Sequence, residues 1–358
     1  MRAVPLVTAI LAVRNESQHI ESVLQSLLEQ EQSGLELEIL VVDGDSSDGT
    51  REIIERLRHS TPRIKLLANV HRKAPYAFNL GIQHARGEYV CILGAHTRYA
   101  KNYIAACLGE LQKRRVAGCS GRLITSPSNS SLQAHLVSWA LGHPFGTSRR
   151  SVRTQSPGFA DTIPYPVFRK DTLLAVGGYD TRLHRNQDID LSQRLCARGY
   201  KLYVTGETSC EYFVSATVRS LMRYAFKTGY WNLISLKQNR RSMAARHLAP
   251  FAFVSTLLLF LGLFVGASWL QGSSRFWLRS PLVALVVAYA LATLMATMHI
   301  AFRERSLSAL LLPPVFLGFH LSYGLGTLWA FITCASIPPK RADNFQESRQ
   351  VFEGHQDH

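Results

Sequence analysis

Two carboxylates stand close together in the stretch RNQDIDLSQRL, at Asp188 and Asp190. The stretch has the pattern of a helix that can turn three apolar residues toward a core: Ile189, Leu191 and Leu195. Acids at the start of a helix are ordinary capping groups, because they bond the unpaired backbone N–H groups there. A carboxylate in such a place can also act as a general base. The residue types alone leave capping and catalysis equally open.

Further polar residues follow three predicted strands, in the loops 14–16, 43–48 and 94–98. Strands that alternate with helices form parallel sheets, and their carboxyl ends then meet at one edge. Open sheets of this kind bind nucleotides at that edge. Any single polar residue there could be a helix N-cap, but three such loops favour a ligand site.

The elements that would position these residues belong to an α/β domain. Apolar runs predict buried strands at 7–13, 38–42, 64–67 and 88–94, and helical patterns follow at 14–30, 51–58 and 75–85. The six cysteines form no CxxC pair or metal-ligand spacing, which favours a reducing compartment for this domain.

Four stretches resemble the motifs of family 2 nucleotide-sugar glycosyltransferases: VRNE at 13–16, VVDGDSSDGT at 41–50, RKAPYAFNLGIQHARGEYV at 72–90 and RNQDIDLSQRL at 185–195. HPFGTSRRS at 143–151 and DTIPYPVFRKDTLLAVGGYD at 161–180 also resemble the ExoA-like, succinoglycan-type branch of that family. The resemblance covers roughly residues 5–235. It implies the GT-A fold, a Rossmann-like α/β domain with a mostly parallel sheet and flanking helices, and an inverting hexosyltransferase activity.

The resemblance also implies a site for a UDP-sugar donor. Asp43 would accept a hydrogen bond from the uracil ring, and Arg14 and Glu16 would lie against the nucleoside. Arg72 would help to hold the base or the phosphates. The other residues expected at the donor site are Val13, Asp45, Asn79, Gly94, Ala95 and Asp161. Asp161 could equally contact the acceptor, or be only an acid before a strand.

The loop after the fourth strand departs from the family pattern. Relatives usually carry Asp-x-Asp or Asp-Ala-His there, whose last residue binds a divalent metal, and this chain has Gly94-Ala95-His96. A neutral imidazole suits Mn²⁺ better than Mg²⁺. We expect a cation, Mn²⁺ or Mg²⁺, held by His96 and the donor diphosphate. The alternatives are a weakened or lost dependence on metal and a surface histidine without such a role.

The resemblance assigns Asp188 as the catalytic base. Inverting transfer needs a base beside the acceptor hydroxyl as it attacks the sugar opposite the leaving nucleotide. Relatives usually have Glu before this Asp, whereas this chain has Gln187, and the loss of a like charge would leave the pKa of the base somewhat lower. Asp190 would then be a capping or supporting acid.

Residues 215–248 interleave basic and aromatic side chains, as in helices that lie in a membrane interface. The alternative is an amphipathic helix packed on the catalytic domain. Contacts with the acceptor or with anionic membrane lipid are expected from five residues: Arg149, Arg150, Arg223, Lys227 and Trp231. The basic loop at 149–153 could equally be a solvated segment.

Three apolar stretches, 250–270, 281–301 and 307–335, are long enough to cross a bilayer. The third contains Pro313-Pro314 and could be a kinked span or a re-entrant hairpin. Arg303 and Arg305 favour a cytoplasmic catalytic domain by the positive-inside rule. Basic residues at 340–341 argue for an even number of spans, so the count stays between two and four.

The formal charge of +15 suggests a polyanionic partner. With apolar spans present and no aromatic-basic RNA motif or zinc finger, anionic lipid and diphosphate substrates are favoured and nucleic acid is not expected. The predicted parts are a GT-A catalytic domain (1–214), basic amphipathic interfacial helices (215–248), a transmembrane region (249–335) and a polar tail (336–358).

The sequence therefore predicts a multi-pass protein of the bacterial inner membrane with a cytoplasmic catalytic domain. It would be an inverting glycosyltransferase that moves a hexose from a UDP-sugar to a hydroxyl of a polyprenyl-diphosphate-linked saccharide, in exopolysaccharide or cell-surface glycan assembly. The alternatives are a polyprenyl-phosphate sugar synthase and a catalytically idle scaffold that binds nucleotide sugar.

Overall fold

A computed structural model describes residues 4–31, 34–238, 245–269, 271 and 273–333. The chain forms two compact units. We call them the sheet unit, within Met1–Ile124 and Gln155–Phe213, and the helical unit, within Thr125–Thr154 and Val214–Ile337. The predicted tail, 336–358, lies outside the described residues.

The division differs from the predicted one in one segment. Residues 125–154 were expected in the catalytic domain, but they belong to the helical unit. The physical reason is that the helix at Leu132–Leu141 buries apolar residues on both sides, including Leu136, Val137 and Ala140, and so needs helices around it.

The sheet unit is built on one mixed sheet with the order β3-β2-β1-β4-β8-β6-β9-β5, and β7 also pairs with β9. The strands are β1 (Leu6–Val13), β2 (Glu36–Asp43), β3 (Ile64–Ala68), β4 (Tyr89–Gly94), β5 (Thr97–Tyr99), β6 (Gly118–Pro127), β7 (Gly158–Phe159), β8 (Val167–Arg169) and β9 (Leu202–Val214). The four predicted strands are present as β1 to β4, and the predicted GT-A-like α/β class is confirmed.

The sheet is parallel only in its first half. β1 pairs in parallel with β2 and β4, and β2 with β3, whereas β8 is antiparallel to β4 and β6, and β9 to β5 and β7. A mostly parallel sheet was predicted. The later strands differ because they pair with segments far away in the chain, β8 with β4 and β9 with β5.

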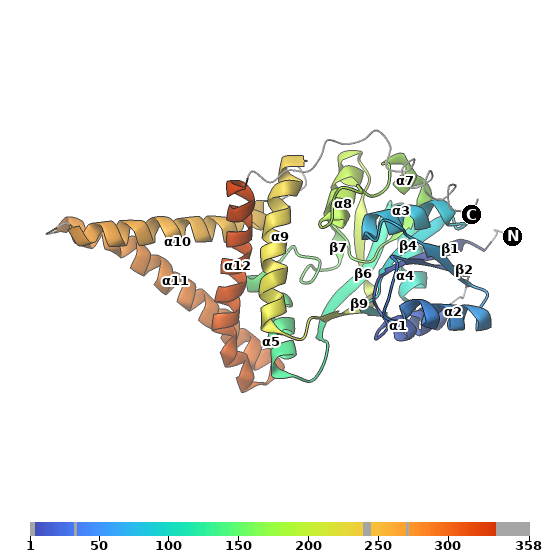
Figure 1. The fold of residues 1–358 in the computed structure, drawn as a ribbon, viewed down its shortest axis with the longest axis horizontal. Coiled ribbons are helices and arrows are strands. Elements are labelled where there is room, and N and C mark those ends of the chain that lie inside the picture. Colours follow the sequence, from blue (N-terminus) through green and yellow to red (C-terminus); the bar gives the residue numbers. More distant parts are fainter. Residues whose placement is uncertain (1–3, 32–33, 239–244, 270, 272, 334–358) are drawn as a thin grey trace. The chain divides into compact units, whose positions relative to one another are not determined.

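Helices cover both faces of the sheet (Figure 1). They are α1 (Ile20–Leu28), α2 (Thr50–Ser60), α3 (Ala74–His84), α4 (Tyr103–Arg114), α7 (Lys170–Ala175) and α8 (Gln187–Ala197). One core joins the sheet to α1, α2 and α4, and a second core joins it to α3, α7 and α8. β1 is apolar almost throughout because it contributes alternate residues to both cores, and each fully buried Ile or Leu adds roughly 1.5–3 kcal/mol.

The register of the parallel strands brings the predicted site loops to one edge. Val13 pairs with Asp43 across β1 and β2, and Ala12 pairs with Gly94 across β1 and β4. The loops after these three strands therefore start side by side.

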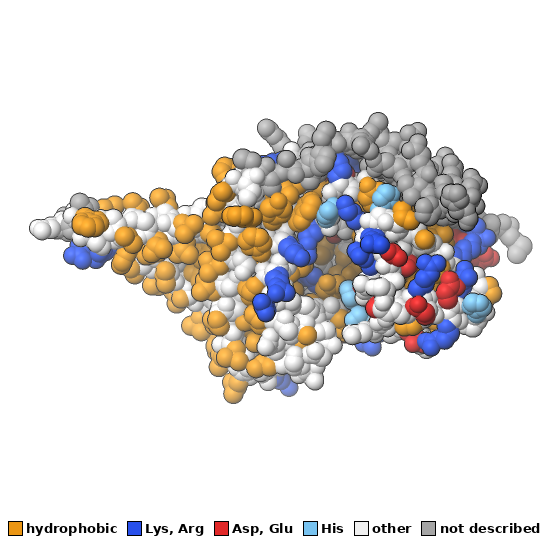
Figure 2. All heavy atoms as spheres, viewed as in Figure 1, with side chains coloured by type: hydrophobic (Ala, Val, Ile, Leu, Met, Phe, Trp, Pro, Cys, Tyr) orange, Lys and Arg blue, Asp and Glu red, His pale blue; other side chains and the backbone are white. Residues whose placement is uncertain are grey.

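The helical unit contains α5 (Leu132–Leu141), α6 (Pro144–Thr147), α9 (Val218–Gln238), α10 (Ala249–Gly266), α11 (Ser273–Glu304) and α12 (Leu312–Ile332), with short 3-10 helices at Ala245–Leu248, Ala267–Trp269 and Leu307–Leu311. Three stretches are long and apolar enough to cross a membrane: Arg246–Trp269, Ser274–Glu304 and Leu307–Ile332. Apolar side chains cover the outer surface of α10 and α11 (Figure 2), as expected for helices in contact with lipid.

The described part of the third apolar stretch, 307–333, is a short 3-10 helix followed by one long helix and not a hairpin. The two prolines lie in the first turn of α12, which then continues without interruption to Ile332. Proline is tolerated in a first turn because its missing N–H would have no helical partner there.

The predicted interfacial helix is half of a close helix pair. α9 runs beside α12 (Figure 1), and an added Cβ at Gly229 would collide with the carbonyl oxygen of Tyr323. Thr327 Oγ1 donates to the carbonyl of Gly229 (3.0 Å), and Asn232 Nδ2 donates to the Tyr323 hydroxyl. Small residues and interhelical hydrogen bonds of this kind are typical of helix pairs in membranes.

Candidate active site

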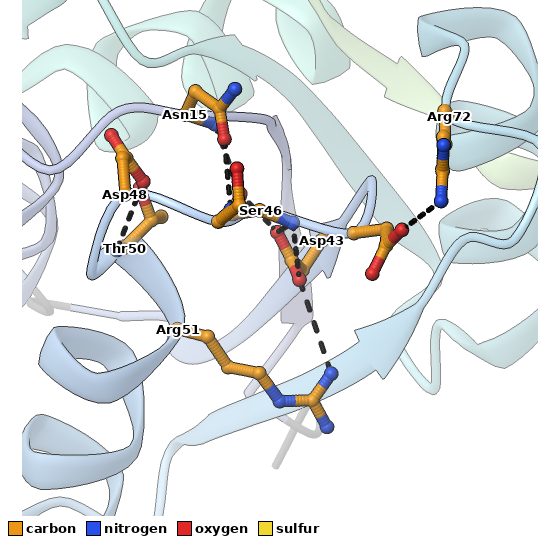
Figure 3. Close-up of polar contacts among 9 residues, drawn as sticks. Asn15, Asp43, Ser46, Asp48, Thr50, Arg51 and Arg72 are labelled. Carbon is orange, nitrogen blue, oxygen red and sulfur yellow. Dashed lines mark hydrogen bonds and ion pairs between the residues drawn. The ribbon is translucent and has the colours of Figure 1, made fainter.

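The loops after β1 and β2 are bonded to each other (Figure 3). The backbone N–H of Asn15 donates to Ser46 Oγ (2.9 Å), and Asn15 Oδ1 accepts from the N–H of Ser47 (3.0 Å). The N–H of Glu16 donates to Thr50 Oγ1 (2.7 Å). Asn15 has a φ of 57°, in the left-handed region that Asn tolerates better than most residues. The two loops thus form one surface at the sheet edge.

Asp43, the residue predicted to bond uracil, ends β2 and is 1% exposed. Its Oδ1 accepts from the Ser46 hydroxyl (2.6 Å), and Arg51 Nη1 lies 4.0 Å from its Oδ2 (Figure 3). A nucleobase that bonds Asp43 would therefore meet a carboxylate that Ser46 already orients.

Asp45 and Arg72 form an ion pair that joins the loop after β2 to the loop after β3 (Figure 3). Both residues have positive φ, 60° and 56°, which is costly for side chains other than glycine. Both side chains are more than half exposed. The pair is therefore open to a ligand that arrives from solvent.

His96, the predicted metal ligand, bonds Glu16. His96 Nε2 lies 3.0 Å from Glu16 Oε1, and the His19 ring packs edge-on against the His96 ring at 5.1 Å. The bond to Glu16 raises the pKa of His96 above its ordinary value, although burial opposes this. The two residues, predicted for different roles, lie together.

Gly94 and Ala95 lie at the end of β4 and are held through the backbone. The N–H of Gly94 donates to the Tyr99 hydroxyl (2.8 Å), and that hydroxyl lies 3.3 Å from the Gly94 carbonyl. Ala95 is 5% exposed and Tyr99 is 4% exposed. The turn that presents His96 is therefore fixed from below by a buried tyrosine.

Asp188 lies in the first turn of α8 and is exposed. Desolvation by the surrounding protein raises the pKa of Asp188, and the N–H groups of Asp188 and Ile189 oppose this. The sequence predicted a lower pKa for Asp188 than in relatives that have Glu at position 187. Relative to an ordinary aspartate, however, the pKa of Asp188 is raised, because of desolvation. An exposed carboxylate with a raised pKa has the properties of a general base.

Asp190 has a different role, as predicted for a supporting acid. It is 5% exposed and accepts from Arg194 Nε (2.8 Å). Arg194 in turn donates to the carbonyls of Val176 and Gly178, both at 2.7 Å. Asp190 thus fixes the turn before α8, which positions the start of the helix and Asp188.

Asn79, which was predicted for the donor site, bonds the backbone of Tyr179. It is fully buried, its Nδ2 donates to the Tyr179 carbonyl and its Oδ1 accepts from the Tyr179 N–H, both at 2.8 Å. Both polar groups of the amide thus bond the turn that leads to α8. Val13 is also buried, and its carbonyl accepts a hydrogen bond from the Gly44 N–H (2.8 Å). Arg14 and Asp161, the remaining two residues predicted for the donor site, are exposed.

The residues predicted for acceptor or lipid lie in the helical unit. Arg149 and Arg150 are exposed after α6, and Arg223 and Lys227 are exposed on α9. Trp231 packs beside the small core of Ile234 and Ala330 where α9 meets α12. Within 125–154 and 214–337 the sequence has 14 Lys and Arg and a single acid, Glu304, so this unit holds most of the net charge of +15.

Sequence reasoning missed Tyr165, whose ring lies beside Gly94. It also missed His19, which packs on His96. The one available signal was the run Pro164-Tyr165-Pro166, since a residue between two prolines has few conformations.

A divalent cation would find few protein ligands here. No group of three or more His, Cys, Asp or Glu that could hold a metal occurs in the described part of the chain. The Glu16 carboxylate and the His96 imidazole, 3.0 Å apart, are one oxygen and one nitrogen donor. Cations at nucleotide sites often take one or two protein ligands and the rest from phosphate and water. The pair fits a cation of that kind.

The sheet unit has a GT-A-like fold. A solved mannosyltransferase, PcManGT from Pyrobaculum calidifontis in complex with GDP-Man and Mn²⁺, has a TM-score of 0.55 and 19% identity, covering 92% of this chain and 88% of its own. At that identity the likeness shows the fold alone.

The sequence comparisons give the family. The model described as "Glycosyl transferase family 2" matches residues 8–172. The succinoglycan biosynthesis protein ExoA of Rhizobium meliloti (strain 1021) is 27% identical over 247 residues, 68% of this chain and 74% of its own. The chain therefore contains a family 2 glycosyltransferase domain, as the motifs indicated, and it is a glycosyltransferase.

A second relative has a lipid-linked acceptor in its name. It is the "dolichyl N-acetyl-alpha-D-glucosaminyl phosphate 3-beta-D-2,3-diacetamido-2,3-dideoxy-beta-D-glucuronosyltransferase" of Methanococcus voltae. It is 24% identical over 332 residues, 89% of this chain and 95% of its own. The similarity thus extends through the apolar helices.

Proposed function

We propose that the protein is an inverting glycosyltransferase that moves a hexose from a UDP-sugar to a hydroxyl of a polyprenyl-diphosphate-linked saccharide. It would act during exopolysaccharide or cell-surface glycan assembly, as a multi-pass protein of the bacterial inner membrane with the sheet unit in the cytoplasm. The names of the two curated relatives, a succinoglycan biosynthesis protein and a transferase to a dolichyl-linked sugar, support this assignment.

The observation that carries the proposal is the state of Asp188. Its carboxylate is exposed at the start of α8, its pKa is raised, and its neighbour Asp190 is fully engaged by Arg194. The acceptor hydroxyl would give its proton to Asp188 as its oxygen forms the new bond to the sugar and the bond to UDP breaks.

For the donor, the proposal uses the bonded loops after β1 and β2. Asp43 and the Asp45–Arg72 pair would meet the uridine, and Glu16 and His96 would lie at the diphosphate end. A divalent cation held by Glu16 and His96 would offset the negative charge of the diphosphate as it leaves. The Glu16–His96 bond would first open to release both donor atoms.

For the acceptor, the charge of the helical unit supports a lipid-linked diphosphate. Arg219, Arg223 and Lys227 recur every four residues of α9, all exposed, so they form one basic row on the helix. Each such side chain near an anionic lipid surface contributes about 1 kcal/mol. Arg149 and Arg150 would add to the same attraction.

The decisive measurement is UDP release in the presence of a lipid-linked saccharide acceptor, for wild type, Asp188→Asn and a matched control, Asp171→Asn. Asp171 is likewise an exposed acid in the first turn of a helix, α7. We expect kcat to fall about 10²- to 10⁴-fold in Asp188→Asn and to stay within about twofold in the control.

Other outcomes point to other functions. Full activity of Asp188→Asn on a polyprenyl monophosphate would support a polyprenyl-phosphate sugar synthase, because an ionised phosphate needs no base. UDP binding without turnover on any acceptor would support a nucleotide-sugar-binding scaffold.

A further inference from the structure

The ring of Tyr165 occupies the space that a side chain at position 94 would need. A Cβ built on Gly94 would lie 2.8 Å from Cε1 of Tyr165 and 3.3 Å from its hydroxyl oxygen. Real Cβ atoms essentially never lie within 3.0 Å of another heavy atom, so a larger residue at 94 would require the Tyr165 ring to shift. The phenol thus lies at the carboxyl end of β4, beside the loop that carries His96.

The backbone of Tyr165 has a strained conformation. Its φ of 46° lies in the left-handed region, and the proline that follows it disfavours helical backbone as well. Contacts with neighbouring strands and rings keep it in place. The Tyr103 hydroxyl donates to the Tyr165 carbonyl (2.9 Å), the Ile92 N–H donates to the Pro166 carbonyl (3.0 Å), and the Tyr99 ring packs edge-on at 5.8 Å. Strain that is held by several buried groups is more common at functional sites than elsewhere.

Three acids at this edge already have side-chain partners. Glu16 is bonded to His96, Asp45 to Arg72, and Asp43 to Ser46. At the end of β4 the chain therefore presents a neutral phenol. A phenol O–H donates a hydrogen bond to an anionic oxygen and brings no negative charge toward it.

We propose that Tyr165 is a positioning residue for the diphosphate of the nucleotide donor, and that its hydroxyl takes the place of a side chain at position 94. The inference rests on the proposed function, because it assumes a nucleoside diphosphate at this edge. It adds a residue to which the motif at 161–180 assigned no role, and it makes Gly94 and Tyr165 one coupled pair.

The coupling can be tested without turnover, by Mn²⁺ binding followed with electron paramagnetic resonance. The variants are Gly94→Asp, Tyr165→Ala and the double variant. We expect Gly94→Asp alone to leave the Mn²⁺ affinity within about threefold of wild type, because Tyr165 fills the space. The double variant should bind Mn²⁺ at least about tenfold more tightly, since a carboxylate is then free to ligate. An equal gain in Gly94→Asp alone would overturn the coupling.

The contact to the donor is tested with Tyr165→Phe, which keeps the ring and removes only the hydroxyl. The affinity for UDP, measured by calorimetry, should fall about 3- to 10-fold, the effect of one lost hydrogen bond. The matched control is Tyr200→Phe, which removes a hydroxyl from a partly buried tyrosine at the other end of the sheet. Unchanged affinity in Tyr165→Phe would overturn the proposal and assign Tyr165 to packing.

The same titrations separate this inference from the proposed function. Wild type and Tyr165→Phe are both titrated with UDP, GDP and ADP. A preference for GDP or ADP would contradict the UDP donor, while a weaker binding of that preferred nucleotide to Tyr165→Phe would still support Tyr165. Equal binding of the preferred nucleotide to both proteins would reject the positioning role of Tyr165 and leave the proposed function untouched.

Discussion

The two units of the molecule bury polar groups in different ways. In the sheet unit the buried acid Glu38 accepts from Thr8, Lys65 and Arg86. In the helical unit, whose sequence has one acid, the buried polar groups include hydroxyls, amides and imidazoles, and some of them bond across helices, as Thr327 bonds Gly229. Charged networks suit a domain that folds in water, and small neutral contacts suit helices that pack in lipid.

The largest expected effect is at the glycine contacts of the helical unit. In Gly229→Ala the new methyl would collide with the Tyr323 carbonyl and force α9 away from α12. Overpacking against backbone is among the costlier substitutions, so we expect a loss of about 3 kcal/mol. Hydrogen exchange of the detergent-solubilised protein, followed peptide by peptide, should show faster exchange in α9 and α12.

Gly262→Ala in α10 is the matched control, because an added Cβ there has nothing within 4 Å. It should leave exchange unchanged or slower, since Ala has the higher helix propensity. Equal effects of the two substitutions would show that helix propensity, and not close packing, governs the helical unit.

In the sheet unit the corresponding substitution is Glu38→Gln. Burial alone would raise the pKa of Glu38, but its bonds to Lys65, Arg86 and Thr8 lower it from 4.5 to about 2. The ionised network therefore stabilises the fold above pH 4.5, and that contribution is lost as the pH falls toward 2. Because Lys65 and Arg86 are partly exposed and can regain water, we expect Glu38→Gln to cost only about 2 kcal/mol at neutral pH.

Thermal unfolding of wild type and Glu38→Gln, from pH 7 down to pH 3, checks this. The difference between the two proteins should shrink below pH 4.5. A difference that stays constant with pH would mean that the network contributes packing and not charge.

The sequence predicted the parts of the molecule whose pattern is local. β1 to β4 follow from apolar runs, and the three site loops from the rule that parallel strands end at one edge. The antiparallel half of the sheet could not be predicted in this way, because short strands such as β8 pair with residues far away in the chain. The family motifs located Asp188, but its exposure and raised pKa depend on the folded surroundings.

Two residues have contacts that the sequence did not predict, for a common reason. Asn79 lies in a motif, yet its amide bonds Tyr179, a hundred residues later. No role was expected for Tyr165, yet its ring lies beside Gly94. Both depend on contacts between distant segments, which spacing along the chain does not reveal.

A smaller effect is expected from acid on the helical unit. Burial lowers the pKa of His143 from 6.5 to about 4, with smaller contributions from His299 and Arg303. The fold requires a neutral His143. The stability that depends on this neutral form is fully present above pH 6.5 and is lost as the pH falls toward 4. Hydrogen exchange corrected for the intrinsic rate should show the helical unit loosening in that window, before the sheet unit responds at pH 4.5 and below.

His143→Leu tests the origin of that loosening. His143 accepts from the Phe145 N–H (3.1 Å) and lies 3.0 Å from Nδ1 of His299, so its loss should cost about 1 kcal/mol at pH 7.5. The variant should show a smaller change than wild type between pH 6.5 and 4. If the variant keeps the full acid response, another group in the unit is responsible.

The smallest effect on stability is expected at the Asp45–Arg72 pair. Both side chains are more than half exposed, and such pairs contribute little because water solvates each charge well. Arg72→Ala should therefore change the unfolding midpoint by less than the equivalent of about 1 kcal/mol. The strained backbone at both residues nevertheless holds the pair at the donor edge, so UDP affinity should fall about tenfold, as for a lost charged hydrogen bond. Arg56→Ala removes a similarly exposed pair, with Glu21, on the helices α2 and α1, and should change neither quantity. A large loss of stability in Arg72→Ala with unchanged UDP affinity would make the pair a structural link like Glu38 and not part of the donor site.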